Sequence, residues 1–572
     1  MFDAPTVKNM AAAAARQAFN VVRAGTRFKP AFKTLQVGVV LSGALALSAC
    51  GGGSDEVQYG DVGYIQGFYG GLAVDEPIAA LIGRDILTSG GSAADAAAAI
   101  SFALSVTYPS AVSIGGGGVC LVNDSRLGLS EVVDFIPPAG SGVQGSRPSA
   151  IPTLPRGMAA LHARYGRLPW RSVVSPAERL ARLGFQVSRA FANELARAAD
   201  PLYREPSVRA VFAPTGRLLG EGQKLVQPDL AGTLGQIRAG GAGVVYSGRL
   251  ARRIVEGVQE AGGTLTYAEL NAYTPELRLP IIVPFGDDEM HFAPPPAAAG
   301  PMLANMWRIL VEDDFYADAS EQERAHILAE VMKRAGADRK NWIAPGFTTS
   351  IPLEDVVSAQ RVRSLMNGYD PNRATPGREL DPQARQLVEV ISGTGFVVVD
   401  STGMSVSCNL SLYNPFGTGR IAGDTGILLA AAPGLRGRNP LGLGPAIAIN
   451  SNNLRFKFAI ASGGGPLAPA GMIQVMADTL LANEKLDLAI EKPRLLAVDS
   501  PDTVLVETEG GDDLSAALQA KGHPVARLTW QGKVNAVHCP MGILPGRTRE
   551  AVCGVEHDPR GNGLSPYSEG GS

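Results

Sequence analysis

The clearest hydrophobic pattern in the chain is a short apolar run that follows two glycines. Phe396-Val397-Val398-Val399 comes after Ser392-Gly393-Thr394-Gly395 and ends at Asp400. Consecutive β-branched residues favour a strand that is buried on both faces, because such side chains pack well on a pleated surface. The pattern therefore predicts a core strand with a hydroxyl residue, Thr394, at its entry.

Small and apolar residues also dominate two segments nearer the start of the chain. Residues 93–99 are almost all alanine and follow Ser92, which predicts a helix capped by the serine hydroxyl. Residues 114–122 place four glycines before Val119-Cys120-Leu121-Val122, which predicts a tight turn into a buried strand. The glycines do not form a phosphate loop, because no Lys-Ser or Lys-Thr pair follows them and no helix comes next.

Composition places the protein among large globular chains. It has 572 residues, of which 45% are hydrophobic and 18% charged, enough to bury a large core in two tightly joined halves. The 51 basic side chains nearly balance the 54 acidic ones, so nothing indicates nucleic acid as a partner.

The first 49 residues have the character of a targeting signal. A basic leader precedes an apolar run from Val37 to Ala49, which is too short to span a bilayer as a mature helix. The run ends in Leu47-Ser48-Ala49-Cys50, which looks like a bacterial lipobox, and 50–62 would be the lipidated cysteine and a flexible tether. We therefore expect a lipoprotein anchored to the membrane through a lipid on Cys50. The alternative is an ordinary secretory signal with a chance cysteine.

This interpretation also predicts where the protein is found. It would face the periplasm in the bacterial cell envelope. The outer membrane is favoured over the inner one, because the residue after Cys50 is not aspartate.

Several motifs together resemble the gamma-glutamyltransferases, which are N-terminal nucleophile hydrolases. They are Gly90-Gly91-Ser92-Ala93-Ala94-Asp95-Ala96-Ala97, the Tyr108-Pro109 turn with Ile114 and its four glycines, Phe416-Gly417 through Leu429, and Ser462-Gly463-Gly464-Gly465. The resemblance runs in the same order along nearly the whole mature chain. It implies an α+β fold, a four-layer αββα sandwich, built from a large-subunit-like region at 63–392 and a small-subunit-like region at 393–572.

The resemblance also implies a reaction. The precursor would cut itself at residue 393 or 394, and the freed threonine hydroxyl would attack a small amide or peptide substrate such as glutathione. Counted back from Asp400, the nucleophile position falls on Gly393, which has no side chain, so Thr394 is the candidate nucleophile. By strand alternation, Ser392 and Thr394 would share one face.

Other positions of the resemblance are only partly retained. Gly464 and Gly465 match the oxyanion-hole glycines, although they could equally be a turn kept for its shape. Ser411 replaces a second threonine, and an asparagine falls on Tyr413 with Asn414 beside it. The arginine that would clamp the substrate carboxylate falls on Ile136, which cannot make that pair.

The cysteines fit an oxidising compartment. Cys120 and Cys408 lie in apolar strands and are expected as small core residues, whereas Cys539 and Cys553 could close a short loop as a disulfide. A metal site would need His538 or His557 to join them without any Cys-x-x-Cys spacing, so we expect no metal and no cofactor.

Three functions remain open from the sequence. The first is a divergent enzyme that cuts itself before Thr394 and hydrolyses or transfers an amide-linked acyl group. The second is a strict gamma-glutamyltransferase. The third is a catalytically inactive lipoprotein that keeps the fold for binding or assembly.

Overall fold

The computed structural model describes residues 69–140, 147–382, 390–435, 438–543 and 552–566. The expected signal, the tether and Cys50 lie outside the described residues. Residues Gly63–Ser572 belong to one compact unit. Within the described residues, no helix combines the length and the apolar character needed to span a membrane.

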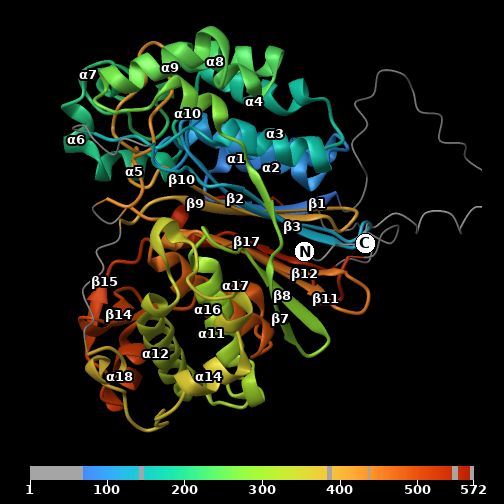
Figure 1. Cartoon of the computed structure of the whole chain (residues 1–572), viewed down its shortest axis with the longest axis vertical. Helices are drawn as coiled ribbons and strands as arrows, with labels where there is room; N and C mark the ends of the chain where they lie inside the picture. Colours follow the sequence, from blue (N-terminus) through green and yellow to red (C-terminus); the bar gives the residue numbers. More distant parts are fainter. Residues whose placement is uncertain (1–68, 141–146, 383–389, 436–437, 544–551, 567–572) are drawn as a thin grey trace, which may run out of the picture. The chain divides into compact units, whose positions relative to one another are not determined.

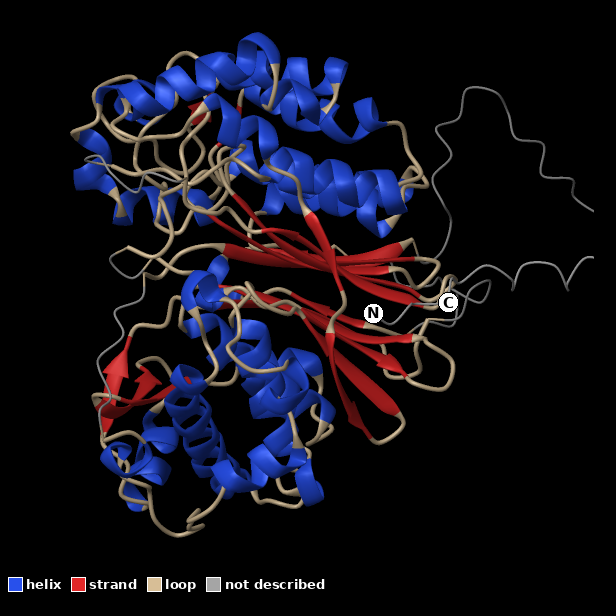
Figure 2. Ribbon diagram, viewed as in Figure 1, coloured by secondary structure: helices blue, strands red, loops and turns tan. Residues whose placement is uncertain are grey.

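Two six-stranded sheets lie face to face, and helices cover the outer face of each (Figures 1 and 2). This is the expected four-layer αββα sandwich. The first sheet has, in order, β1 (Gly70–Val74), β9 (Thr394–Asp400), β10 (Ser405–Ser411), β2 (Gly117–Asp124), β3 (Leu129–Phe135) and β6 (Glu276–Arg278). The second has β17 (Gly554–Glu556), β16 (Lys533–His538), β12 (Phe456–Gly463), β11 (Ala446–Asn450), β8 (Asp288–Phe292) and β7 (Ile281–Phe285).

Ten helices of the described chain lie on the side of the first sheet. They are α1 (Pro77–Thr88), α2 (Ala93–Thr107), α3 (Leu154–Tyr165), α4 (Trp170–Leu183), α5 (Arg189–Arg197), α6 (Ala199–Tyr203), α7 (Pro206–Phe212), α8 (Pro228–Gly240), α9 (Gly248–Glu260) and α10 (Tyr267–Ala272). A two-stranded sheet of β4 (Phe185–Gln186) and β5 (Lys224–Leu225) connects some of them.

The other described helices belong to the side of the second sheet, together with a small third sheet. The helices are α11 (Ala299–Leu310), α12 (Glu321–Asp338), α13 (Leu353–Val356), α14 (Ala359–Leu365), α15 (Gly377–Leu380), α16 (Leu467–Leu480), α17 (Leu486–Glu491) and α18 (Asp512–Ala520). The small sheet has β13 (Leu495–Asp499), β14 (Asp502–Glu507) and β15 (Val525–Leu528).

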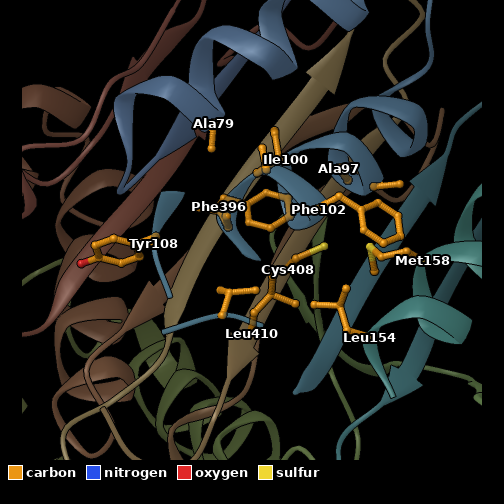
Figure 3. Packing of buried hydrophobic residues seen from close by; sticks show 14 of the residues in the cluster. Ala79, Ala97, Ile100, Phe102, Tyr108, Leu154, Met158, Phe396, Cys408 and Leu410 are labelled. Carbon is orange, nitrogen blue, oxygen red and sulfur yellow. The ribbon is translucent and has the colours of Figure 1, made fainter. Parts of the chain in front are cut away.

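Strand β9 confirms the core strand expected from the valine run. All of its residues are buried, and it pairs antiparallel with β1 and β10. Phe396 lies among Ile100 and Phe102 of α2 (Figure 3). On the opposite face, a Cβ atom at Gly395 would lie 2.4 Å from the Ser462 nitrogen of β12, so the two sheets approach closely here because residue 395 has no side chain.

Helix α2 also forms as expected. The Ser92 hydroxyl accepts from the Asp95 backbone N–H while the Asp95 carboxylate accepts from the Ser92 backbone N–H, which makes a reciprocal capping box. The helix is buried along its whole length, and its alanines allow it to pack closely between the first sheet and α4.

The four cysteines of the described chain form two disulfides. Cys539 bonds to Cys553, the pair suggested by their position in one short loop. Cys120 and Cys408 are buried in the core as expected, and they are also bonded to each other, which the sequence analysis did not predict. The reason is the strand pairing: β2 and β10 are antiparallel neighbours, and their register places Cys408 opposite Cys120 across 288 residues of sequence.

Candidate active site

A cavity of about 270 Å³ lies at the entry of β9, between the two halves of the chain. The first half supplies Tyr108, Ser110 and Glu194 to its lining. The second half supplies Gly393, Gly464 and Lys533. Gly393 and the candidate oxyanion glycine Gly464 therefore line one cavity, whereas Thr394 and Gly465 are not among its lining residues.

The glycine turn before α16 holds a carbonyl group of its own chain. The backbone N–H groups of Gly464 and Gly465 both donate to the Ser392 carbonyl oxygen, at 3.2 and 3.1 Å. Both glycines have positive φ angles, +117° and +57°, which L side chains rarely adopt. Two N–H donors on one carbonyl oxygen make an oxyanion-hole arrangement. Here the oxygen that they contact belongs to the peptide bond between Ser392 and Gly393.

The residue after that carbonyl has no side chain that could attack it. Gly393 has a φ of +86°, and a Cβ atom there would lie 2.9 Å from the Leu410 carbonyl oxygen and 3.5 Å from the Ser411 hydroxyl. The backbone is thus shaped around a glycine at this position. The two donors and the carbonyl are in place, but residue 393, which follows the peptide bond that they hold, carries no nucleophile.

Thr394 faces a different environment. Its hydroxyl is buried and donates to Asp75 Oδ2 at 2.5 Å, and it is not among the residues that line the cavity. Ser392 does line the cavity, so the expected common face of Ser392 and Thr394 is wrong. The positive φ of Gly393 breaks the strand alternation between them.

Asp75, directly after β1, connects Thr394 to the second sheet. Its Oδ1 accepts from the Asn535 side-chain amide of β16 at 2.7 Å, and the same amide donates to the Gly395 carbonyl. Burial raises the pKa of the Asp75 carboxyl, while Lys533 and the two hydrogen bonds oppose the rise. The candidate nucleophile Thr394 stays a prediction, with a buried carboxyl as its partner.

Lys533 places a buried positive charge in the cavity wall. Its Nζ donates to the Tyr108 hydroxyl at 2.5 Å and to Glu194 Oε1 at 2.7 Å. Burial alone would lower the pKa of Lys533, but Tyr108, Glu194 and Asp75 outweigh it and hold the pKa above its ordinary value. Burial likewise opposes the charge of Glu194, but Lys533 keeps its pKa below the ordinary value. The pair is therefore charged at neutral pH.

The other predicted site residues divide between the cavity and the surrounding core. Asn414 lines the cavity, and its amide donates to the carbonyls of Pro415 and Gly417. Ser411 is buried, and its hydroxyl accepts from the Tyr413 backbone N–H. Tyr413 and Ile136 are buried and do not line the cavity, and the Tyr413 hydroxyl donates to the Pro137 carbonyl.

Sequence reasoning missed the charged part of this site. Tyr108 was noticed only as part of a proline turn, and Asp75, Glu194 and Lys533 belong to no motif. Lys533 meets Glu194 across 339 residues of sequence. No local signal could have revealed a contact that depends on how the two sheets are stacked.

One group of possible metal ligands occurs among the described residues, away from the cavity. His326, Glu330 and His523 place ligand atoms within 4.8 Å of one another. Protein partners already contact these atoms: His326 bonds to His523 and to the Asp370 carbonyl, and Glu330 pairs with Arg334. The arrangement reads as a buried polar network, and we assign no metal to it.

Solved structures share this architecture. A cephalosporin acylase from Bacillus halodurans superposes with a TM-score of 0.73 at 24% identity, over 88% of this chain and 96% of that one. At this identity the match shows the common fold.

Curated sequences match over most of their length. The glutathione hydrolase proenzyme of Escherichia coli (strain K12) is 29% identical over 566 residues, 91% of this chain and 97% of the relative. The acylase ACY 1 proenzyme of Pseudomonas sp. (strain V22) is 29% identical over 537 residues, which are 84% of this chain and 92% of the relative. The family model described as gamma-glutamyltranspeptidase matches residues 79–433 and 437–563. The sandwich and the glycine turn beside β9 agree with this match. The chain therefore belongs to the gamma-glutamyltranspeptidase family.

Proposed function

We propose that this family member stays in one piece and binds a small molecule in the cavity beside Gly393 without forming an acyl-enzyme. A single observation carries the proposal. Gly464 and Gly465 hold the Ser392 carbonyl, and the next residue, Gly393, has no hydroxyl to attack it. An N-terminal nucleophile mechanism needs that hydroxyl both for self-cleavage and for catalysis.

The immediate surroundings support the same conclusion. Gly393 is held in a conformation that a threonine would rarely adopt. The nearest downstream hydroxyl, on Thr394, is turned towards Asp75 and away from the cavity. In the cavity, polar groups from both halves of the chain converge on one space, as the few polar groups of a small-molecule site do.

The first test is a denaturing gel with an intact mass, on protein expressed without residues 1–49 so that no lipid is attached. We expect one species with the mass of the unbroken chain. Two fragments would contradict the proposal, and their masses would locate the cut.

A second candidate is amide hydrolysis or acyl transfer with Thr394 as the nucleophile, as in the family's hydrolases. The hydrogen bond from Thr394 to Asp75 favours it, because a buried carboxylate could take the hydroxyl proton. This candidate requires fragments that meet between Gly393 and Thr394. Even then, glutathione and gamma-glutamyl anilides should be poor substrates, because Ile136 stands where the clamping arginine is expected.

We also propose that the protein is a lipoprotein held in the cell envelope through Cys50. The segment Leu47-Ser48-Ala49-Cys50 and the glycines after it support this. Metabolic labelling with a fatty-acid analogue should label the protein expressed with its residues 1–49, and it should not label a Cys50→Ser variant. Equal labelling of both would refute the anchor.

A further inference from the structure

The cavity beside Gly393 carries an excess of positive charge. Lys533 and Arg197 line it, and Glu194 is the one carboxylate among its described lining residues. Glu194 Oε1 already accepts from Lys533 at 2.7 Å, from Arg197 at 3.2 Å and from the Tyr108 hydroxyl at 3.3 Å. The lining therefore offers a ligand more cation than anion, and Oε1 of its carboxylate already accepts three hydrogen bonds.

Two hydrogen-bond donors in the wall are not fully used by the described chain. Ser110 is 4% exposed, and its hydroxyl has no hydrogen-bond partner among the described residues although it belongs to the lining. An ammonium group has three N–H donors, and the hydrogen bonds of Lys533 within the described chain use two of them. A buried hydroxyl without a partner is costly, so a ligand oxygen that accepts from it would relieve that cost.

The same arrangement disfavours a ligand that carries its own ammonium group. Glu194, Tyr108 and Asp75 surround a cation that the chain itself supplies, the Lys533 ammonium. A second ammonium in this small cavity would lie near the like charges of Lys533 and Arg197, and Glu194 Oε1 already accepts three hydrogen bonds. A zwitterionic amino acid therefore fits this wall less well than a simple organic acid.

We propose that the cavity binds a small carboxylate without an ammonium group, held by Lys533 and Ser110. The inference rests on the proposed function, since it treats the cavity as a binding site in an uncut chain. It goes further by naming the ligand class and by excluding amino-acid-like ligands.

Glutarate and L-glutamate provide a matched pair of probes, because they have the same carbon chain and two carboxylates and differ by one ammonium group. Binding would be measured by calorimetry on protein lacking residues 1–49, which leaves the compact unit Gly63–Ser572 intact. We expect glutarate to bind about tenfold or more tightly than L-glutamate. Butanoate, which has the same net charge as L-glutamate, should compete with glutarate better than L-glutamate does.

Variants then test the two named groups. Ser110→Ala should weaken glutarate binding by about tenfold, and Lys533→Met should abolish it. Lys457→Met is the control, because Lys457 lies on β12 outside the cavity lining and donates to the Pro540 carbonyl; it should bind glutarate normally.

The outcomes separate this inference from the proposed function. A single uncut chain that binds neither acid, or binds L-glutamate as tightly as glutarate, overturns the inference and leaves the proposed function standing. Unchanged glutarate binding in Ser110→Ala and Lys533→Met also overturns it. If Lys533→Met does not fold, the inference is still tested by comparing glutarate with L-glutamate on the unaltered protein and by glutarate binding to Ser110→Ala. Fragments in the intact mass would instead refute the proposed function itself.

Discussion

The Thr394 hydroxyl donates a hydrogen bond of 2.5 Å to the Asp75 carboxyl, 319 residues away in the sequence. Both residues are buried, and the bond joins the entry of β9 to the residue that follows β1. It accounts for a hydroxyl residue at the start of a core strand in structural terms.

Thr394→Ala should therefore change stability and leave the chain uncut. The variant removes a donor from a buried carboxyl, which costs about 1–3 kcal/mol in the free energy of unfolding. Thr394→Ser keeps the hydroxyl and should lose less. Urea denaturation measures both, and a parallel intact mass checks the chain. If unaltered protein is cut and Thr394→Ala is not, Thr394 is the nucleophile after all.

Gly393→Ala tests whether the backbone before β9 requires glycine. At a φ of +86° an L residue costs about 1–2 kcal/mol, and the contact with the Leu410 carbonyl adds to this. Gly90→Ala is a matched control, because Gly90 has a φ of +84° but open space around its Cβ position. We expect the loss of stability at Gly393 to exceed that at Gly90. Equal losses would mean that the Leu410 contact is easily relieved.

Lys533→Met should destabilise the protein even without a ligand. It leaves Glu194 partly buried without its lysine, and the loss of one partner of a buried ion pair costs about 3–5 kcal/mol. The side chain of Glu194 is 19% exposed, so we expect the lower end of this range. The Lys457→Met control, at a half-buried lysine that donates to the Pro540 carbonyl, should change the unfolding free energy by only about 1 kcal/mol or less. A similar value for both lysines would contradict the buried-pair interpretation.

Stability should also fall as the solution becomes acidic. Burial, with the neighbouring His326, lowers the pKa of His523 to about 4 from 6.5. The unfolded chain therefore binds a proton at this histidine before the folded chain does, and stability is lost as the pH falls from about 6.5 towards 4. The contribution is at most about 1.4 kcal/mol per pH unit. His523→Gln should flatten the pH profile in this window, and an unchanged slope would exclude His523 as its source.

Local patterns in the sequence were enough for the elements around the site. The valine run predicted β9, and the alanines with Ser92 predicted α2. Gly464 and Gly465 were named only through the family resemblance, and they lie within hydrogen-bond distance of the Ser392 carbonyl before β9. Each of these depends on neighbouring residues or on a turn that only glycine allows.

Contacts between distant strands could not be predicted in this way. The Cys120–Cys408 bond depends on the pairing of β2 with β10, and the Lys533–Glu194 pair depends on the stacking of the two halves. The expected common face of Ser392 and Thr394 failed because alternation holds only within regular strand, and the φ of Gly393 ends that regularity.

The glycine turn before α16 has a mechanical consequence in a chain that is never cut. Its two N–H groups grip the Ser392 carbonyl and so fix the segment that leads into β9 against the start of a helix in the second half of the chain. An arrangement of two N–H donors that is suited to stabilising negative charge during bond breaking then holds two segments of the chain together. In the proposed uncut chain, where residue 393 has no side chain, the same two N–H groups have this mechanical role alone.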